Sequence, residues 1–230
     1  MSRLSDSSAG PLLCYVTDRR GIAEGESCET YEALLLKIEA AAAAGVDWIQ
    51  IREKDLSGKA CGRLTRDALL RAAKSRTSNA VTTRILVNDR VDVALSERAA
   101  GVHLGENSFP LPEAKRLASA RAQARDFLIG VSCHSVEAAK VGASGGADYL
   151  HFGPVFATPS KAAYGAPQGL DLLAEVCRAV SIPVLAIGGI TQANAAACLA
   201  AGASGIAAIR LFQDAPDMLA LVHSLRKLTL

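Results

Sequence analysis

The sequence has no marked excess of charge and no long apolar run, and each absence excludes a class of protein. The formal net charge is only +2, from 25 basic and 23 acidic residues, which does not provide the clustered basic face of a nucleic-acid-binding protein. No apolar run approaches the roughly 20 residues that cross a bilayer. The start, MSRLSDSSAG, lacks the apolar core of a signal peptide. These features predict a cytoplasmic protein without a nucleic-acid or membrane partner.

Cysteine motifs are also missing, and aromatic residues are few. The six cysteines are scattered with no C-x-x-C pair, so we expect free, mostly buried thiols and no zinc site. Aromatic residues make up 4% and hydrophobic residues 50% of the chain, a balance typical of closely packed α/β layers. The length of 230 residues falls within the roughly 200–250 residues of a single α/β barrel.

The sequence does contain a regular alternation of short apolar runs and longer helical patterns. Near-continuous apolar runs, expected of strands covered on both faces, span residues 12–18, 48–53, 84–89, 101–105, 127–133, 149–156, 183–189 and 205–211. Helical spacing fills the intervals at 31–45, 57–75, 91–100, 112–124, 135–144, 170–180, 191–202 and 215–228. An open doubly wound sheet is the alternative, but no G-x-G-x-x-G loop follows the first run. The alternation predicts a single (β/α)8 TIM barrel over residues 11–230, after a disordered tail at 1–10.

Polar residues gather at the ends of the predicted strands, where such barrels carry their catalytic groups. In QIREK, alternation points Gln50, Arg52 and Lys54 the same way, towards one polyanion; a solvated charged loop is the alternative. Asn88 and Asp89 close the third strand. The Asp89 carboxylate can hold Mg²⁺, which uses one or two carboxylates plus substrate phosphate, or it can cap the next helix.

The later strands suggest a phosphate site. Gly188 and Gly189 follow the seventh strand, where backbone N–H groups can approach a phosphate without a Cβ in the way. The long segment ATPSKAAYGAPQG contains Thr158, Ser160 and Lys161. We expect it to be a mobile lid over the substrate, with an ordinary surface loop as the alternative.

The four histidines differ in their positions. His134 follows the fifth strand at the mouth of the barrel and is the candidate for proton transfer. His103 and His151 lie within strands and are expected to be core residues with satisfied hydrogen bonds. His223, on the last helix, is expected at the surface.

With these residues placed, the sequence resembles the thiamine-phosphate synthase/TenI family of (β/α)8 barrels. The motifs that carry the resemblance are, in order, YVTD, QIREK, NDRVDVAL, GVHLG, GVSCHS, ADYLHFGPVFATPSK, IPVLAIGGI and AGASGIAAI. Synthases of this family join an aminopyrimidine-methyl diphosphate to a thiazole phosphate and release diphosphate. The resemblance implies a Mg²⁺-dependent transferase of thiamine biosynthesis with two small phosphorylated substrates; whether it forms a homo-oligomer stays open.

The resemblance also implies individual roles. Asp89 would bind Mg²⁺, and catalysis would consist of positioning and electrostatic stabilisation without a protein nucleophile. The catalytic set would be Arg52, Lys54, Ser132, His134 and Lys161. The pyrimidine diphosphate would be bound by Gln50, Arg52, Lys54, Asn88, Ser132 and Lys161. The thiazole phosphate would contact Thr158, Ser160, Gly188, Gly189, Ile209 and Arg210.

Two positions depart from the synthase pattern. After HLG the synthases carry Q-[ED]-D, whose last Asp is the second Mg²⁺ ligand, whereas this chain has Glu106, Asn107 and Ser108. Arg210 stands where the family usually has a serine. We favour the synthase because the diphosphate motifs are intact. The run around Ser108 resembles TenI-type thiazole tautomerases, which need no Mg²⁺. A tautomerase with His134 as acid and base is therefore the alternative, as is a non-catalytic thiamine-phosphate-binding protein.

Overall fold

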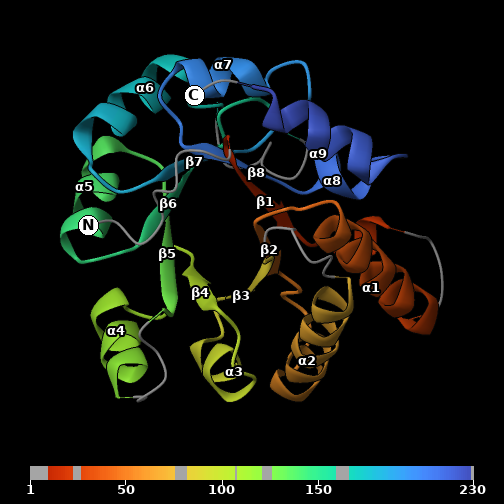
Figure 1. Ribbon diagram of the computed structural model, residues 1–230. Helices are drawn as coiled ribbons and strands as arrows, with labels where there is room; N and C mark the ends of the chain where they lie inside the picture. The colour runs from red at the N-terminus through yellow and green to blue at the C-terminus, as the bar shows by residue number, and fades with distance from the viewer. Residues whose placement is uncertain are drawn as a thin grey trace.

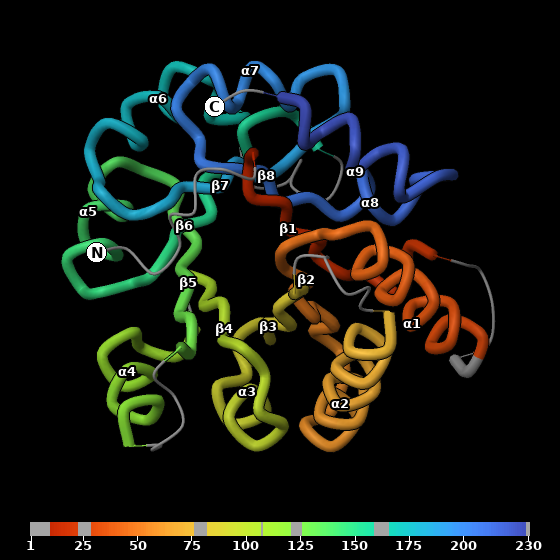
Figure 2. Tube along the Cα trace, in the orientation of Figure 1, coloured from red at the N-terminus to blue at the C-terminus, as the bar shows by residue number. Residues whose placement is uncertain are grey.

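A computed structural model describes residues 10–22, 27–75, 82–106, 108–120, 126–158 and 166–228, of which 27 and 28 by backbone alone. Its strands form a closed, all-parallel barrel in which each strand pairs with the next and β8 returns to β1. The first and last strands of the chain therefore lie side by side (Figure 2). The predicted TIM barrel is confirmed. The strands are β1 (Leu12–Val16), β2 (Trp48–Ile51), β3 (Arg84–Asn88), β4 (Gly101–Leu104), β5 (Leu128–Cys133), β6 (Tyr149–Phe152), β7 (Val184–Ile187) and β8 (Gly205–Ala208).

The helices lie outside the ring of strands (Figure 1). They cover the outer faces of the strands with the main apolar clusters of the molecule, which explains why the strands are apolar throughout. The described helices are η1 (Arg19–Gly21), α1 (Ser27–Ala43), α2 (Gly58–Lys74), α3 (Val91–Ser96), α4 (Leu111–Ser119), α5 (Val136–Ser144), α6 (Gly169–Ala179), α7 (Ala195–Ala200), α8 (Arg210–Gln213) and α9 (Met218–Arg226).

Several strands are shorter than the apolar runs that predicted them. The run at 149–156 continues past Phe152 through the cis peptide Gly153–Pro154 into the loop after β6. The run at 205–211 ends as a strand at Ala208, because the short helix α8 begins at Arg210. Apolar character alone does not mark where a strand ends, since the first loop residues are also partly buried.

A separate apolar cluster fills the inside of the barrel. The single tryptophan, Trp48, packs against Tyr149 with ring centroids 4.6 Å apart. A Cβ at Gly130 would lie 2.1 Å from the Tyr149 ring, so a glycine is needed beside this large side chain. The few aromatic residues thus include two that close the centre of the barrel. The buried members of this cluster are Cys14, Val16, Trp48, Leu86, Leu128, Tyr149, Leu185 and Ala207.

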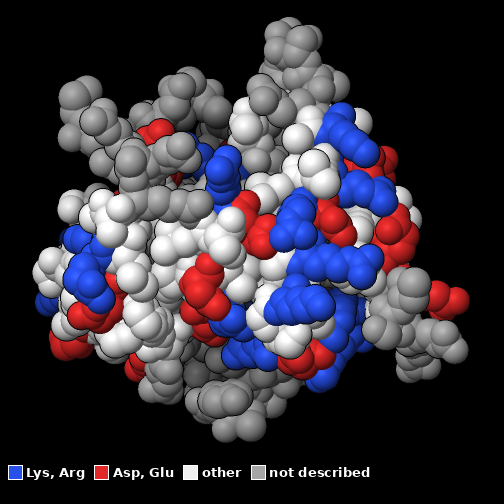
Figure 3. All heavy atoms as spheres, turned by 90° about the horizontal axis from the view of Figure 1, so that it is seen from below, with Lys and Arg blue, Asp and Glu red and all other residues white. Residues whose placement is uncertain are grey.

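The surface reflects the near-balanced charge of the chain. On the face shown in Figure 3, basic and acidic side chains are interspersed. Within the described ranges, no helix has the length and apolar character needed to cross a membrane. The cysteines whose side chains are described carry free thiols, as predicted: Cys14, Cys61, Cys133, Cys177 and Cys198.

Candidate functional site

A chain of polar side chains crosses the ends of β2, β3 and β4 at the mouth of the barrel. The Gln50 amide donates from Nε2 to Asn88 Oδ1 at 2.7 Å, and Asn88 donates from Nδ2 to Asp89 Oδ2 at 2.6 Å. The Asp89 Oδ1 atom accepts from the backbone N–H of Gly105 at 3.0 Å. Gln50 Oε1 is buried and has no partner within the described residues. The chain therefore ends in an unused acceptor inside the barrel.

Asp89 has an unusual backbone conformation, with a φ of 60°. Both its carboxylate oxygens are engaged by Asn88 and Gly105, and helix α3 begins without a side-chain cap. The alternative that Asp89 caps the next helix is therefore wrong. Aspartate enters the left-handed region more readily than most residues, and the two hydrogen bonds hold its carboxylate in place.

Ser108, at the position of the departure from the synthase pattern, and Asp89 both lie beside Gly105. A Cβ built on Gly105 would be 3.4 Å from Asp89 Oδ1 and 3.9 Å from Ser108 Cβ. The Ser108 Oγ atom is buried and has no hydrogen-bond partner in the described part of the chain. An unsatisfied buried hydroxyl costs free energy unless a bound group supplies the partner.

The three predicted polyanion contacts in QIREK differ in burial. Gln50 is buried inside the barrel, Arg52 is half-buried at its rim, and Lys54 is exposed. Among the described residues, no side chain forms a hydrogen bond or ion pair with the Arg52 guanidinium or the Lys54 ammonium. Both cations therefore remain available for an anion.

Ser132 belongs to a buried polar stack that includes both strand histidines. Its Oγ lies 2.9 Å from His103 Nε2, and His103 Nδ1 lies 3.2 Å from the Tyr149 hydroxyl. The His103 and His151 rings stack with centroids 4.1 Å apart. The expectation of satisfied core histidines is confirmed for His103. It is wrong for His151, whose Nε2 is buried without a partner among the described residues, because stacking against His103 occupies its face and not its nitrogen.

Burial controls the protonation of these histidines. Desolvation lowers the pKa of His103 to about 3. Asp89 opposes this shift with a smaller raising effect, and Arg52 adds to the lowering. Desolvation and the neighbouring His103 lower the pKa of His151 well below its usual range. Both rings are therefore neutral near pH 7, and neither carries a charge to the mouth of the barrel.

His134 has a different environment at the end of β5. Its Nδ1 contacts the carbonyl oxygen of Gly153, and its Nε2 lies 3.9 Å from Glu106 Oε2. Because a carbonyl only accepts, the ring proton is held on Nδ1, and Nε2 of the neutral ring has a free lone pair. About a third of the side chain is exposed. The sequence pointed to His134 but not to its partner, Glu106.

Gly188 and Gly189, after β7, both have positive φ, at 94° and 65°. A Cβ on Gly188 would lie 2.5 Å from Pro154, and one on Gly189 would lie 2.6 Å from the Ala157 carbonyl oxygen. The pair is thus required by close packing against the loop after β6. Within the described chain their N–H groups have no acceptor, so they can also donate to an anion.

The remaining predicted site residues follow β6 and β8. Ile209 is half-buried and precedes α8, and Arg210 is exposed at its first residue. Thr158 ends the described part of the loop after β6. Ser160, Lys161, Asn107 and residues 1–9 of the predicted tail lie outside the described residues, and so does most of the expected lid.

Sequence reasoning missed a cluster behind the QIREK cations. The Glu53 carboxylate accepts from Thr17 Oγ1 at 2.7 Å and from Arg19 Nη1 at 3.0 Å. The Glu53 side chain is 2% exposed. The signal in the sequence was the run REKD, in which basic and acidic residues alternate directly after β2.

The chain matches known proteins over most of its length. A family model described as "Thiamine monophosphate synthase" matches residues 20–212. Two relatives are thiamine-phosphate synthases. That of Methanocella arvoryzae is 46% identical over 81% of this chain and 82% of its own. That of Chloroflexus aurantiacus is 40% identical over 93% and 91%.

A solved structure agrees with these sequence matches. The thiamine phosphate pyrophosphorylase of Pyrococcus furiosus has a TM-score of 0.77 and 32% identity, and the match covers 94% of this chain and 95% of that one. The fold, the family model and the relatives thus point the same way. The chain belongs to the thiamine monophosphate synthase family.

Proposed function

We propose that this protein is a thiamine-phosphate synthase, which joins an aminopyrimidine-methyl diphosphate to a thiazole phosphate and releases diphosphate. The family match and the relatives named thiamine-phosphate synthase support this function. One observation in the structure carries it. A buried amide acceptor, Gln50 Oε1, and two uncommitted cations, Arg52 and Lys54, come from the same strand end. A substrate with a polar ring at one end and a polyanion at the other matches a buried acceptor followed by two cations.

The pyrimidine would enter the barrel ring first. Asn88 engages the Gln50 amide nitrogen, so the buried Oε1 atom is left as an acceptor without a partner among the described residues, suited to the exocyclic amine of an aminopyrimidine. Ser132, held by His103, would provide a second polar contact. Burial of these groups favours a ligand that satisfies them, because an unpaired buried acceptor is costly.

The diphosphate would lie at the rim. Arg52 and Lys54 would contact its oxygens, and Lys161, outside the described residues, would join them. Charge-assisted hydrogen bonds to phosphate are stronger than neutral ones, above all in a partly buried site. The cations therefore stabilise the negative charge that grows on the leaving diphosphate.

The residues beside Asp89 fit a magnesium ion. The Asp89 carboxylate after β3 and the unsatisfied Ser108 hydroxyl after β4 are hard oxygen donors that both border Gly105, the ligand type that Mg²⁺ prefers. No group of three His, Cys, Asp or Glu side chains converges within the described ranges. Asp89 and Ser108 would thus hold the ion together with diphosphate and water, and the ion would neutralise charge on the leaving group.

The thiazole phosphate would lie on the β6–β8 side of the mouth. The unused N–H groups of Gly188 and Gly189 support this placement. The side chains assigned to it are Thr158 and Ser160 from the loop after β6 and Arg210 after β8, with Ile209 against the ring. An arginine here provides a permanent charge for the phosphate where a serine would provide only a hydroxyl.

The reaction then needs no protein nucleophile. The bond between the methylene carbon and the diphosphate oxygen breaks, its electron pair leaves with diphosphate, and the thiazole nitrogen forms the new carbon–nitrogen bond. The protein holds both substrates in line and excludes water from the positively charged pyrimidine carbon. Positioning and preorganised charge account for catalysis of this kind.

The function is tested by supplying both substrates, with and without Mg²⁺, and following thiamine phosphate. Formation of thiamine phosphate and diphosphate in equal amounts is the expected result. If thiamine phosphate binds but no product forms under either condition, the chain is a binding protein and the proposal is wrong.

Replacing Ser108 with aspartate should lower the Mg²⁺ concentration that the reaction needs. A second carboxylate beside Asp89 adds a charged ligand, and we expect the Mg²⁺ concentration for half-maximal rate to fall about tenfold. Ser119→Asp is the matched control, because it adds the same charge at an exposed position at the C-terminal end of α4, the end away from Ser108. Equal Mg²⁺ curves for wild type and Ser108→Asp would argue against an ion at this site.

A second candidate function, thiazole tautomerase, is favoured by the geometry of His134. Its Nε2 lies 3.9 Å from Glu106 Oε2, so a proton taken up on Nε2 would be attracted to a neighbouring carboxylate. If this activity exists, His134→Ala should lower conversion of the unaromatised thiazole tautomer at least about 100-fold. Formation of thiamine phosphate from the aromatic thiazole should change far less. Conversion that is absent in the wild type, or undiminished in His134→Ala, rules out this second function.

A further inference from the structure

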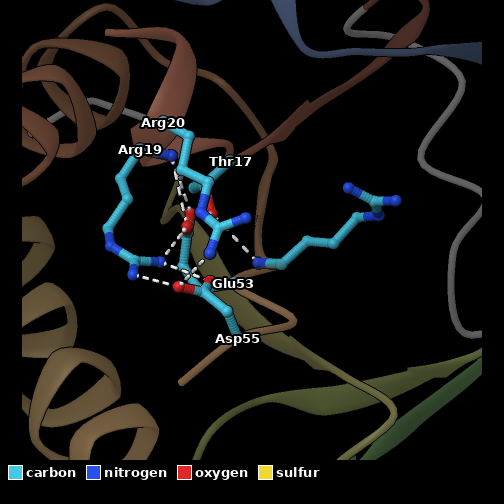
Figure 4. Close-up of polar contacts among 6 residues, drawn as sticks. Thr17, Arg19, Arg20, Glu53 and Asp55 are labelled. Carbon is cyan, nitrogen blue, oxygen red and sulfur yellow. Dashed lines mark hydrogen bonds and ion pairs between the residues drawn. The ribbon is translucent and has the colours of Figure 1, made fainter. Parts of the chain in front are cut away.

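A compact ionic cluster joins the end of β1 to the end of β2 (Figure 4). Besides its bonds to Thr17 and the Arg19 guanidinium, the Glu53 carboxylate accepts the backbone N–H of Arg19 at 3.2 Å. Arg19 continues to Asp55, with Nη1 at 2.7 Å from Oδ1 and a second contact from Nη2. Arg20 adds a contact to Asp55 at 3.0 Å. Two arginines and two carboxylates thus neutralise one another.

This cluster is connected to the backbone of Arg52 through one hydroxyl. Thr17 Oγ1 donates to Glu53 Oε1 and accepts from the Arg52 N–H at 2.9 Å. The backbone N–H of Thr17 donates to the Gln50 carbonyl at 2.9 Å. Glu53, 8% exposed as a residue, therefore fixes the strand end from which Gln50, Arg52 and Lys54 project.

The cluster also pairs the two carboxylates of the REKD run and leaves its two cations unpaired within the described ranges. The run lies in the loop and turn that follow β2, and its acidic and basic side chains have different contacts there. Arg19 and Arg20 engage Glu53 and Asp55, whereas Arg52 and Lys54 have no acidic partner among the described residues. Without Arg19, two carboxylates adjacent in sequence to the free cations would compete with a polyanion for them.

We propose that Glu53 and Arg19 are positioning residues, which hold the end of β2 and keep Arg52 and Lys54 free to receive the diphosphate. This inference rests on the proposed synthase function. Neither residue touches substrate in this scheme: Glu53 acts through Thr17 and the β2 backbone, and Arg19 acts by occupying the carboxylates. The role predicts an effect on the diphosphate substrate that the thiazole phosphate, bound across the barrel mouth, does not share.

The first test is Glu53→Gln. Its amide NH₂ would face the donors of Arg19 and Thr17, so the strand end loosens. We expect the KM for the pyrimidine diphosphate to rise about tenfold, with the KM for the thiazole phosphate unchanged within about twofold. The matched control is Arg66→Gln, which breaks another Arg–Glu pair, with Glu97 between α2 and α3. Equal rises in both KM values, or none, would overturn the proposal.

Arg19→Gln separates positioning from general stability. It leaves Glu53 and Asp55 without their main cation, so the KM for the pyrimidine diphosphate should rise more than in Glu53→Gln. The double variant Glu53→Gln with Arg19→Gln removes both charges and should recover part of this loss. A double variant no better than Arg19→Gln would contradict competition by the freed carboxylates. If Glu53→Gln does not fold, Asp55→Asn, at the exposed end of the cluster, replaces it with the same expectation.

Binding of inorganic diphosphate with Mg²⁺, measured by calorimetry, distinguishes failure of this inference from failure of the proposed function. The wild type should bind it, and both single variants should bind it about tenfold more weakly. A wild type that binds diphosphate but makes no thiamine phosphate refutes the synthase function and not the positioning role. Undiminished diphosphate binding in both variants refutes the positioning role, whatever the synthase activity.

Discussion

Replacing Asp89 with asparagine is expected to lower kcat/KM for thiamine phosphate formation at least about 100-fold. The substitution keeps the left-handed backbone, since asparagine tolerates a φ of 60° nearly as well as aspartate. It removes the formal negative charge of the carboxylate assigned to Mg²⁺. It also removes a carboxylate whose two oxygens both accept hydrogen bonds, one from Asn88 and one from Gly105.

The loss of this acceptor also changes the hydrogen bonding of Gln50. Aspartate only accepts, so Asn88 must donate to it and must in turn accept from Gln50 Nε2. An asparagine at position 89 can donate to Asn88 Oδ1, and the Asn88 amide would then turn its Nδ2 towards Gln50 Oε1. The acceptor assigned to the pyrimidine amine would be consumed. We therefore expect a higher KM for the pyrimidine diphosphate as well as a weaker response to Mg²⁺.

Steady-state kinetics over a series of Mg²⁺ concentrations checks both effects. Asp92→Asn is the matched control, because Asp92 pairs with Arg90 at the surface on the first turn of α3. It should leave the kinetics unchanged. An Asp89→Asn variant with activity within about threefold of wild type would refute both the metal role and the directional amide chain.

Acidification should destabilise the protein more steeply than its carboxylates explain. His103 and His151 are buried as neutral rings, with the pKa of His103 lowered to about 3 and that of His151 lowered well below its usual range by desolvation. In the unfolded chain both titrate near pH 6.5. Below that pH the unfolded state binds protons that the folded state does not, so the free energy of unfolding falls as pH falls.

The size of the effect follows from linkage. Each histidine removes about 1.4 kcal/mol per pH unit below its unfolded pKa. Between pH 6.5 and 4.5 His103 alone costs about 2 kcal/mol, and His151 adds a loss of the same sign, against a total stability of roughly 5–15 kcal/mol for a domain. Salt-bridged Asp55 and Asp92 have pKa values lowered by Arg19 and Arg90, so their loss begins mainly at lower pH.

Urea unfolding at a series of pH values measures how steeply the free energy of unfolding changes with pH. His151→Phe keeps a flat ring against His103 but does not titrate, and it should reduce the slope by about half. His223→Asn, at an exposed position on α9, is the control and should leave the slope unchanged. A free energy of unfolding that stays level from pH 6.5 to 5 would show that the two rings protonate in the folded state.

The regular alternation of apolar runs and helical patterns made the fold predictable from the sequence. Eight apolar runs joined by helical patterns leave few arrangements other than a parallel barrel, since strands that are apolar on both faces need helices outside and side chains inside. The strand ends were less predictable. Apolar residues such as Phe156 and Ile209 continue past the last residues of β6 and β8.

For the site, the sequence by itself determined which residues stand at the mouth, because their place at the strand ends follows from the order of elements. It could not determine which of them find partners. Only the tertiary structure places Thr17 and Arg19 on Glu53, Glu106 near His134, and the His103 ring against His151. Barrel closure brings together side chains from separate strands, and hydrogen bonding depends on distances that no spacing along the chain records.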